Sequence, residues 1–299
     1  MSIVAQVVAS VRLTEPNESG GAERRPTASG RATRLRPMLD VLPAAILCVV
    51  AVFEILTIAR AGTDTGTDEE WNRAADALKS EWKVGDLVVF APSWVDPVGR
   101  QYFGDLLTID DAARMDAARY KVIWEVSIRG ARSAESAGRS LEEEISVGPI
   151  LIRRWVGESI RVITDFRAAL PASSVPQGVP RPRLSLEEVG FKPHRCILVV
   201  PKPDQTVAID FPDTELGTSI VGYAGLGDVF TRRDVREPGR LELLIDGAPV
   251  SEITFGVEDG WVRFSAETTP SRATVTFKLT AIGPAARNRR ICFAAEARQ

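Results

Sequence analysis

The segment that follows the apolar run at residues 86–91 carries side chains of the kinds that bind polar ligands. It offers an aromatic face, two carboxylates, a guanidinium and a phenol, which belong to Trp94, Asp96, Arg100, Tyr102 and Asp105. Ring stacking combined with hydrogen bonds from a few convergent polar groups is what a sugar or a phosphate-linked headgroup needs from a site. We predict these five residues as ligand-binding candidates. The alternative is a packing role, with Trp94 and Tyr102 partly buried and Asp96 capping a helix that begins at Pro97.

Signatures of catalysis are weak, so the sequence favours a protein without catalytic activity. The alternative is an enzyme that acts on a sugar or a lipid-linked headgroup through the loop at residues 94–105. His194 is the only histidine, which excludes a histidine-based metal cluster. The glycines of residues 222–227 do not lead from a strand into a helix, as a dinucleotide-binding site requires. We expect neither a metal nor a cofactor. The formal net charge of −3 argues against a nucleic-acid-binding surface.

Residues 61–148, which would position this loop, are predicted to form a small α/β region. Helical and strand patterns alternate along it: a helix with Asp68 as its cap, a buried strand at 86–91, a helix at 109–120, a strand at 121–128 and a polar helix at 133–144. This order predicts parallel strands covered by helices. Ligands in such sheets collect beyond the carboxyl ends of the strands, which is where Trp94 and its neighbours lie in the chain.

From residue 149 to residue 299 the helical period disappears. Short apolar runs alternate with Gly, Pro and Asp, beginning with a strand expected at 150–156, and Asp246-Gly247 after an apolar run signals a hairpin. Many short strands with such turns predict a β-sandwich or jelly roll. We therefore expect an α+β chain with an N-terminal transmembrane helix, an α/β region and an all-β sandwich.

The three cysteines fall in two regions. Cys48 lies in the N-terminal apolar run, while Cys196 and Cys292 lie in strand-like runs of the all-β region. In an oxidising compartment the latter two could form a disulfide, which by the chain-entropy model would stabilise a loop of about 100 residues by roughly 4.7 kcal/mol. Two separately buried thiols are the alternative.

The apolar run at residues 41–59 predicts a membrane anchor. About 19 residues in a helix span roughly 28 Å, close to the hydrocarbon thickness of a bilayer. We place the transmembrane helix at residues 38–60. Arginines precede the run and acidic residues follow it, so the positive-inside rule predicts that residues 1–37 are cytoplasmic and that the rest of the chain is exported. The composition of residues 1–37 predicts that this tail is disordered. We expect a single-pass inner-membrane protein with its bulk in the periplasm. A cleavable signal peptide is the alternative.

Two stretches resemble known families. GYAGLGDVFTRR, LELLIDG, GWVRFSAET, ATVTFKLTA and ICFAAEAR, within residues 216–298, resemble the galactose-binding-like jelly rolls of carbohydrate-binding modules, which implies sugar binding by loop residues. GDLVVFAPSWVDPVGR and ARYKVIWEVSI resemble the soluble periplasmic regions found with membrane glycosyltransferases of the protein-mannosyltransferase type, although the many membrane spans of those enzymes are absent. The resemblances imply an envelope protein that binds glycan or assists an envelope glycosyltransferase. A scaffold that docks through Glu54 of the predicted membrane helix is a further alternative.

Overall fold

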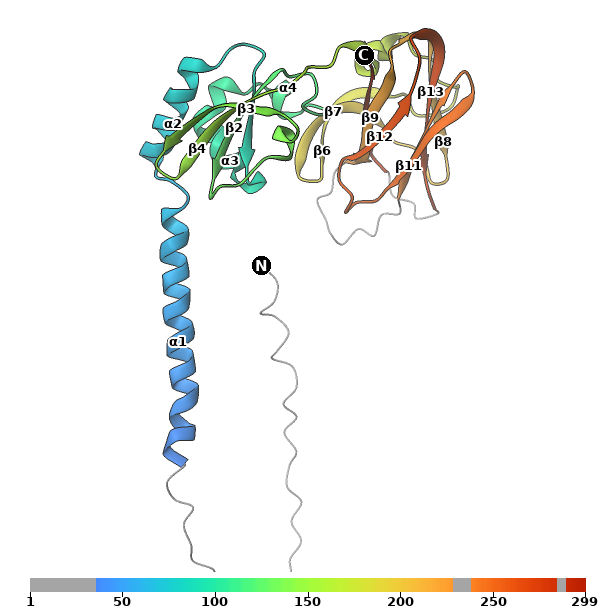
Figure 1. Cartoon of the computed structure of the whole chain (residues 1–299). Helices are drawn as coiled ribbons and strands as arrows, with labels where there is room; N and C mark the ends of the chain where they lie inside the picture. The colour runs from blue at the N-terminus through green and yellow to red at the C-terminus, as the bar shows by residue number, and fades with distance from the viewer. Residues whose placement is uncertain (1–35, 228–237, 284–288) are drawn as a thin grey trace, which may run out of the picture. The chain divides into compact units, whose positions relative to one another are not determined.

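The structure is a computed structural model that describes residues 36–227, 238–283 and 289–299 (Figure 1). The predicted disordered tail lies outside these ranges up to residue 35. The chain divides into two compact units, Met1–Thr57 and Ile58–Gln299. Helix α1 (Arg36–Thr63) contains the boundary between them.

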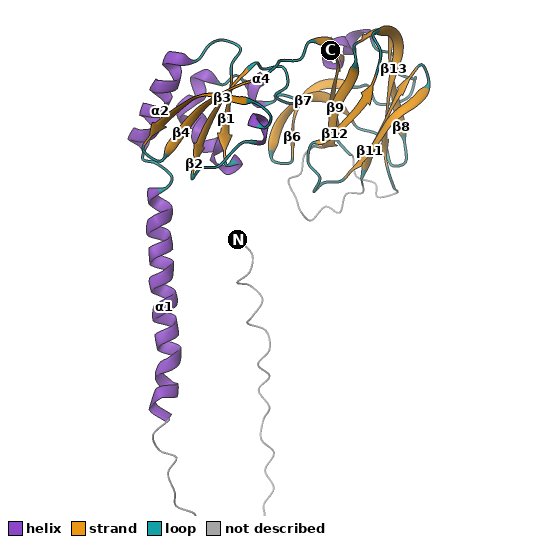
Figure 2. Cartoon of the chain, viewed as in Figure 1, coloured by secondary structure: helices purple, strands orange, loops and turns teal. Residues whose placement is uncertain are grey.

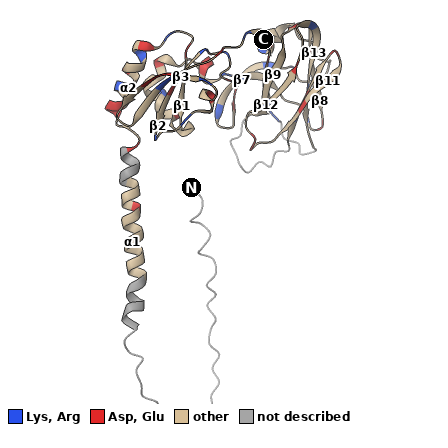
Figure 3. Ribbon diagram, in the orientation of Figure 1, with Lys and Arg blue, Asp and Glu red and all other residues tan. Residues whose placement is uncertain are grey.

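Helix α1 covers the apolar run that the sequence analysis singled out. In residues 43–58, the part of α1 whose side chains are described, Glu54 is the only charged residue (Figure 3). The large apolar side chains between Ile46 and Ile58 are between 47% and 72% exposed. In the ranges that the structure describes, no helix combines the length and the apolarity that crossing a membrane requires. The helical conformation agrees with the expectation, and the membrane span stays a prediction.

The second unit begins with a four-stranded sheet in the order β1-β2-β4-β3. The strands are β1 (Leu87–Ala91), β2 (Val122–Ile128), β3 (Ser140–Val147) and β4 (Ile150–Val156). β1 and β2 pair in parallel, as predicted, whereas β4 runs antiparallel to both β2 and β3. The strand at 150–156, which we expected in the all-β region, therefore completes this first sheet.

Helices cover one face of the first sheet (Figure 2). They are α2 (Asp68–Glu81) and α3 (Asp96–Phe103), with the 3₁₀ turns η1 (Ser93–Val95) and η2 (Gly104–Leu106) beside α3. The cap of α2 is Thr67 and not Asp68: the Thr67 hydroxyl accepts from the Glu70 N–H while the Glu70 carboxylate accepts from the Thr67 N–H. This capping box leaves Trp71 and Leu78 facing the sheet, where both are buried.

One helix predicted in this region is wrong in extent. The segment 109–120 is helical only over α4 (Ile109–Ala112). Beyond it, backbone carbonyls that would continue the helix accept bonds from distant groups: Ala113 from the Arg195 N–H at 2.9 Å and Met115 from Trp261 Nε1 at 3.2 Å. Tertiary hydrogen bonds thus replace the helical ladder.

The polar run at 133–144 forms a 3₁₀ turn, η3 (Ala134–Ser136), and then the edge strand β3 instead of a helix. Its glutamates pair across the strands, with Glu142 on Arg154 and Glu144 on Arg153. These cross-strand ion pairs explain why a charged segment with helical composition is extended here.

The remaining chain forms a β-sandwich. One sheet has the order β11-β10-β13-β8 and the other the order β12-β9-β14-β7-β6, with β5 also pairing with β14. The strands are β5 (Val162–Asp165), β6 (Arg183–Val189), β7 (Lys192–Val199), β8 (Thr206–Leu216), β9 (Ser219–Leu226), β10 (Gly239–Ile245), β11 (Ala248–Phe255), β12 (Val262–Glu267), β13 (Ser271–Ala281) and β14 (Ile291–Arg298). Two short helical turns, α5 (Phe166–Ala169) and η4 (Leu170–Ala172), follow β5. The expected α+β architecture with a sandwich is confirmed.

The core of the sandwich lies between its two sheets. Phe166, Phe277 and Phe293 are fully buried there. The ring centroid of Phe277 lies 4.9 Å from that of Phe166 and 5.0 Å from that of Phe293. The predicted hairpin at Asp246-Gly247 joins β10 to β11, and both of its residues have positive φ. Asp and Gly tolerate that conformation, which is why the dipeptide marks the turn.

Candidate functional site

The predicted loop begins where expected, at the carboxyl end of β1. Trp94 lies in η1 with 55% of its surface exposed, and the guanidinium of Arg129, which follows β2, lies 5.6 Å from the centroid of the indole ring. The carboxyl ends of the two parallel strands therefore bring an exposed aromatic ring and a cation together.

The other four predicted residues bond to one another or to α2, and none of these described bonds involves Trp94. Asp96 and Arg100 form an ion pair along α3 at 2.6 Å. The Tyr102 hydroxyl donates to Asp68 at 2.6 Å, and Lys79 donates to Asp105 at 3.2 Å.

Both Asp68 and Lys79 belong to α2. Tyr102 and Asp105 therefore hold α3 and the turn that follows it against α2, and the Asp96–Arg100 pair lies within a single helix.

A cleft of about 590 Å³ lies elsewhere, between the α4 region and the edge of the sandwich that carries β6 and β7. Its lining contains four carboxylates, from Asp110, Asp116, Asp165 and Glu296. It also contains four guanidinium groups, from Arg114, Arg119, Arg167 and Arg195. The volume is within the range of sites for small ligands, about 300–1,000 Å³. No motif in the sequence predicts this site.

The inner part of the cleft is a closed network of ion pairs. The Glu296 side chain is 1% exposed and pairs with Arg119, Arg167 and Arg298. Asp165 accepts from Arg119 at 2.7 Å and from Arg167 at 2.8 Å. Burial acts to raise the pKa of Asp165, but the bonds and charges of those two arginines outweigh it and hold the pKa below its ordinary value. These charges hold the α4 segment against the sandwich.

The mouth of the cleft is different, because its ion pair is open to solvent. Asp110 Oδ1 accepts from Arg195 Nε, with side chains 69% and 50% exposed. Within the ranges that the structure describes, Asp110 Oδ2 and the two terminal nitrogens of Arg195 have no other partner. The pair therefore presents a free acceptor beside free donors.

Exposed leucines lie beside this pair on the edge strand β6. Leu184 is 57% exposed and lines the cleft, and Leu186 is 46% exposed. Leu186 lies directly opposite Arg195 in the β6–β7 ladder. The mouth thus combines an apolar platform with a paired acceptor and donor.

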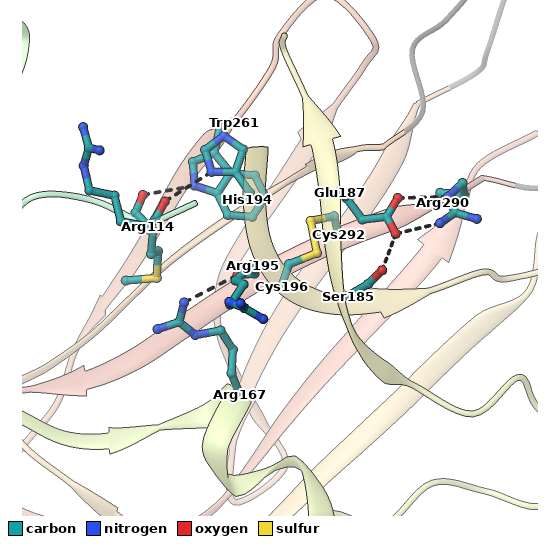
Figure 4. The surroundings of a disulfide bond; sticks show 11 residues. Arg114, Arg167, Ser185, Glu187, His194, Arg195, Cys196, Trp261, Arg290 and Cys292 are labelled. Atoms are coloured by element: carbon teal, nitrogen blue, oxygen red, sulfur yellow. Dashed lines mark hydrogen bonds and ion pairs between the residues drawn. A yellow bond between two sulfur atoms is a disulfide. The ribbon is translucent and has the colours of Figure 1, made fainter. Parts of the chain in front are cut away.

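A disulfide borders the same cleft (Figure 4). Cys196 of β7, which lines the cleft, is bonded to Cys292 of β14, so the disulfide alternative of the sequence analysis is the one that the structure contains. Next to it the rings of His194, Trp261 and Tyr223 stack in series, with centroid distances of 4.3 Å and 6.0 Å. Burial raises the pKa of Tyr223, and the nearby Asp116 carboxylate adds to the effect.

Among the described residues, no group of three or more His, Cys, Asp or Glu side chains is arranged to hold a metal ion. The residues that the sequence analysis did not find, Asp110 and Arg195, are 85 positions apart. The sequence carries no signal that joins them, and only the dense charge of residues 110–119 marks the segment that contains Asp110.

No model of a known protein family and no curated protein matches this sequence. Among solved structures, the chain is similar to a CBM51 from Clostridium perfringens GH95, solved in complex with methyl-galactose, with 10% identity, a TM-score of 0.32 and coverage of 41% of this chain and 92% of that one. It is similar to the tandem CBM51 modules of the family 98 glycoside hydrolase from Streptococcus pneumoniae, with 10% identity, a TM-score of 0.30 and coverage of 50% and 56%. The C-terminal CBM6 of LamC from Zobellia galactanivorans gives 8% identity, a TM-score of 0.26 and coverage of 42% and 97%. At these scores the likenesses do not identify a function.

Proposed function

We propose that this protein binds glycans without catalysis, through the cleft between the α4 region and the β6–β7 edge. The observation that carries the proposal is the exposed Asp110–Arg195 pair, with its free acceptor and donors, beside exposed leucines of β6. A carbohydrate-binding function also agrees with the resemblance of residues 216–298 to carbohydrate-binding modules.

The chemistry of a sugar fits this arrangement. Each sugar hydroxyl can donate and accept, so one hydroxyl can donate to Asp110 Oδ2 while its neighbour accepts from Arg195. The C–H face of a pyranose ring is apolar and can cover Leu184, which removes apolar area from water on both sides. A cleft with both kinds of contact favours a polyhydroxylated ring over a purely apolar ligand.

The alternative of an enzyme acting through residues 94–105 receives less support. Asp96 and Arg100 neutralise each other on α3, and Tyr102 and Asp105 bond to α2. A general acid or base must reach the proton that it transfers, and in this arrangement Tyr102 and Asp105 hold helices together. These contacts favour a structural role for residues 94–105, with Trp94 as an exposed ring.

We also propose that residues 41–59 anchor the chain in the inner membrane, with the N-terminus cytoplasmic and the bulk exported. Support comes from the arginines before the run and from the exposed apolar side chains of α1. The Cys196–Cys292 disulfide is consistent with an oxidising compartment such as the periplasm. Cooperation with an envelope glycosyltransferase stays a prediction from the sequence.

The binding proposal is tested with the full-length chain in mild detergent, by measuring affinity for a panel of neutral and acidic oligosaccharides. A double variant, Asp110→Ala with Arg195→Ala, is expected to bind at least tenfold more weakly, since hydrogen bonds to charged groups contribute about 1.5–3 kcal/mol each. The matched control is Asp213→Ala with Arg272→Ala, another exposed pair, with side chains 74% and 59% exposed. Absence of binding across the whole panel refutes the function.

The anchor is tested separately with a topology reporter fused at the C-terminus. Reporter activity on the exported side is expected. Activity in the cytoplasm refutes the orientation, whatever the glycan panel shows.

A further inference from the structure

The charge balance of the cleft bears on which glycans it accepts. Its four carboxylates match its four guanidinium groups, so the lining carries no net charge. A site for an acidic sugar would need a surplus of positive charge to compensate for the ligand's carboxylate.

The inner guanidinium groups have little capacity left for an anion. Arg167 binds Asp165 through Nε and Nη2 and donates from Nη1 to the Arg195 carbonyl. Arg119 pairs with both Asp165 and Glu296. An anion that approached these arginines would meet two carboxylates at the same place, and the repulsion would oppose its binding.

At the mouth, the Arg195 side chain is 50% exposed and lies beside its partner Asp110. Arg195 retains free N–H groups, but Asp110 lies against it with 69% of its side chain exposed. A ligand carboxylate that reached Arg195 would therefore lie next to the carboxylate of Asp110. A neutral ligand avoids this repulsion and can use both members of the pair, through two adjacent hydroxyls.

We infer that the ligand of the cleft is an uncharged saccharide, gripped through adjacent hydroxyls by Asp110 and Arg195 and through its C–H face by Leu184, and that acidic glycans are rejected by Asp110. This inference rests on the proposed glycan-binding function and adds the class of sugar. Asp110 is then a specificity-determining residue as well as a contact.

The test compares sugars that differ only in charge. The probes are oligosaccharides of glucose and of galactose, together with their uronic-acid counterparts, in which the hydroxymethyl group is a carboxylate. The full-length chain in mild detergent is expected to bind a neutral member at least tenfold more tightly than its acidic counterpart. Raising the salt from 0.05 M to 0.5 M is expected to leave neutral binding unchanged within about twofold, because no net charge drives it.

The variant Asp110→Asn provides the sharpest comparison, since it replaces the negatively charged carboxylate with a neutral amide of nearly the same shape. Neutral binding is expected to fall about fivefold to tenfold, as a charged hydrogen bond becomes a neutral one. Acidic binding is expected to rise, and in a salt-dependent way. The matched control, Asp213→Asn, removes an equally exposed carboxylate beside Arg272 and is expected to change neither affinity.

The possible results distinguish a failure of the neutral-sugar inference from a failure of the proposed glycan-binding function. Acidic sugars that bind the unmodified chain as tightly as their neutral counterparts overturn the inference and leave glycan binding intact. An Asp110→Asn variant that weakens both classes equally also overturns it, since the carboxylate would then have no part in the selection. Binding of neither class removes the proposed function, and the inference with it.

Discussion

The only histidine of the chain allows a precise test of the contact between the α4 segment and the sandwich. His194 is 7% exposed and its Nδ1 lies 3.3 Å from the Arg114 carbonyl oxygen. Because a carbonyl only accepts, Nδ1 must carry the proton, which leaves Nε2 unprotonated. Nε2 is buried and has no partner within the described parts of the chain. Acid is therefore expected to destabilise this contact.

The magnitude follows from the burial of the ring. Burial is the main cause that lowers the pKa of His194 from 6.5 to about 4, and the positive charges of Lys192 and Arg114 lower it further, while the bond to the Arg114 carbonyl acts in the opposite direction. The unfolded chain binds this proton near pH 6.5 and the folded chain only near pH 4. Stability from the neutral ring is complete above about pH 6.5 and falls progressively down to about pH 4. The difference corresponds to about 3 kcal/mol of unfolding free energy.

The assay uses ¹³C-labelled histidine in the full-length chain, where one histidine gives one imidazole signal. We expect the Cε1 chemical shift to remain constant from pH 7.5 to pH 5.5, with the midpoint of titration near pH 4. A midpoint near pH 6.5 would show that the ring is hydrated and would refute the reasoning.

Urea unfolding between pH 7.5 and pH 4 gives the energetic counterpart. His194→Asn keeps an N–H donor but does not titrate, so it is expected to be less stable at neutral pH and to lose about 3 kcal/mol less than the unmodified chain on acidification. Carboxylates whose pKa is lowered, such as Asp165, contribute equally to both proteins and cancel. Parallel pH profiles for the two proteins would contradict the assignment of the effect to His194.

The remaining predictions concern stability measured by chemical unfolding. Replacing Cys196 and Cys292 with serine opens a bridge across 96 residues and is expected to destabilise the fold by about 4–5 kcal/mol. Glu125→Ala removes a fully buried carboxylate that pairs with Arg153 at 3.3 Å and is expected to cost about 3–5 kcal/mol, because the buried Arg153 then keeps only the more exposed Glu144 as a carboxylate partner. Gly99→Ala places a methyl group 2.2–2.5 Å from ring atoms of Phe90, and the resulting overpacking is expected to cost about 1–3 kcal/mol.

Matched controls exist for each of these changes. Cys48→Ser alters a cysteine outside the disulfide, Glu158→Ala alters an exposed glutamate, and Gly104→Ala adds a methyl group to a glycine with no other atom, apart from its chain neighbours, within 4 Å of the added Cβ. Each control is expected to change stability by no more than about 1 kcal/mol. A variant no less stable than its control would contradict the corresponding argument.

Features that depend on neighbours in the chain were predictable. The strands β1 and β2 appear near the expected positions, and Asp246-Gly247 forms the turn that its dihedral preferences favour. Both depend on alternation or on backbone conformation over a few residues. The alternation of apolar residues likewise identified a β-rich second half.

Features that depend on distant partners were not predictable. The helix expected at 109–120 ends at Ala112 because carbonyls of the following residues bond to Arg195 and Trp261 of the sandwich. The polar composition of residues 133–144 predicts a helix, whereas residues 140–147 pair with β4 as the strand β3, and Glu142 and Glu144 bind arginines of β4 there. In both cases a tertiary contact outweighs a weak local preference.

The sequence by itself determined which structural elements this protein contains: an apolar N-terminal helix, an α/β region, a sandwich and two cysteines able to pair. Tertiary structure alone decided where the charged groups meet. Tyr102 and Asp105, which the sequence predicts as ligand-binding residues, bond to side chains of α2. Asp110 and Arg195, with no relation in the sequence, came together at the mouth of a cleft. The physical reason is that local conformation follows from short-range sterics and hydrogen bonds, whereas a site between layers depends on which faces pack together.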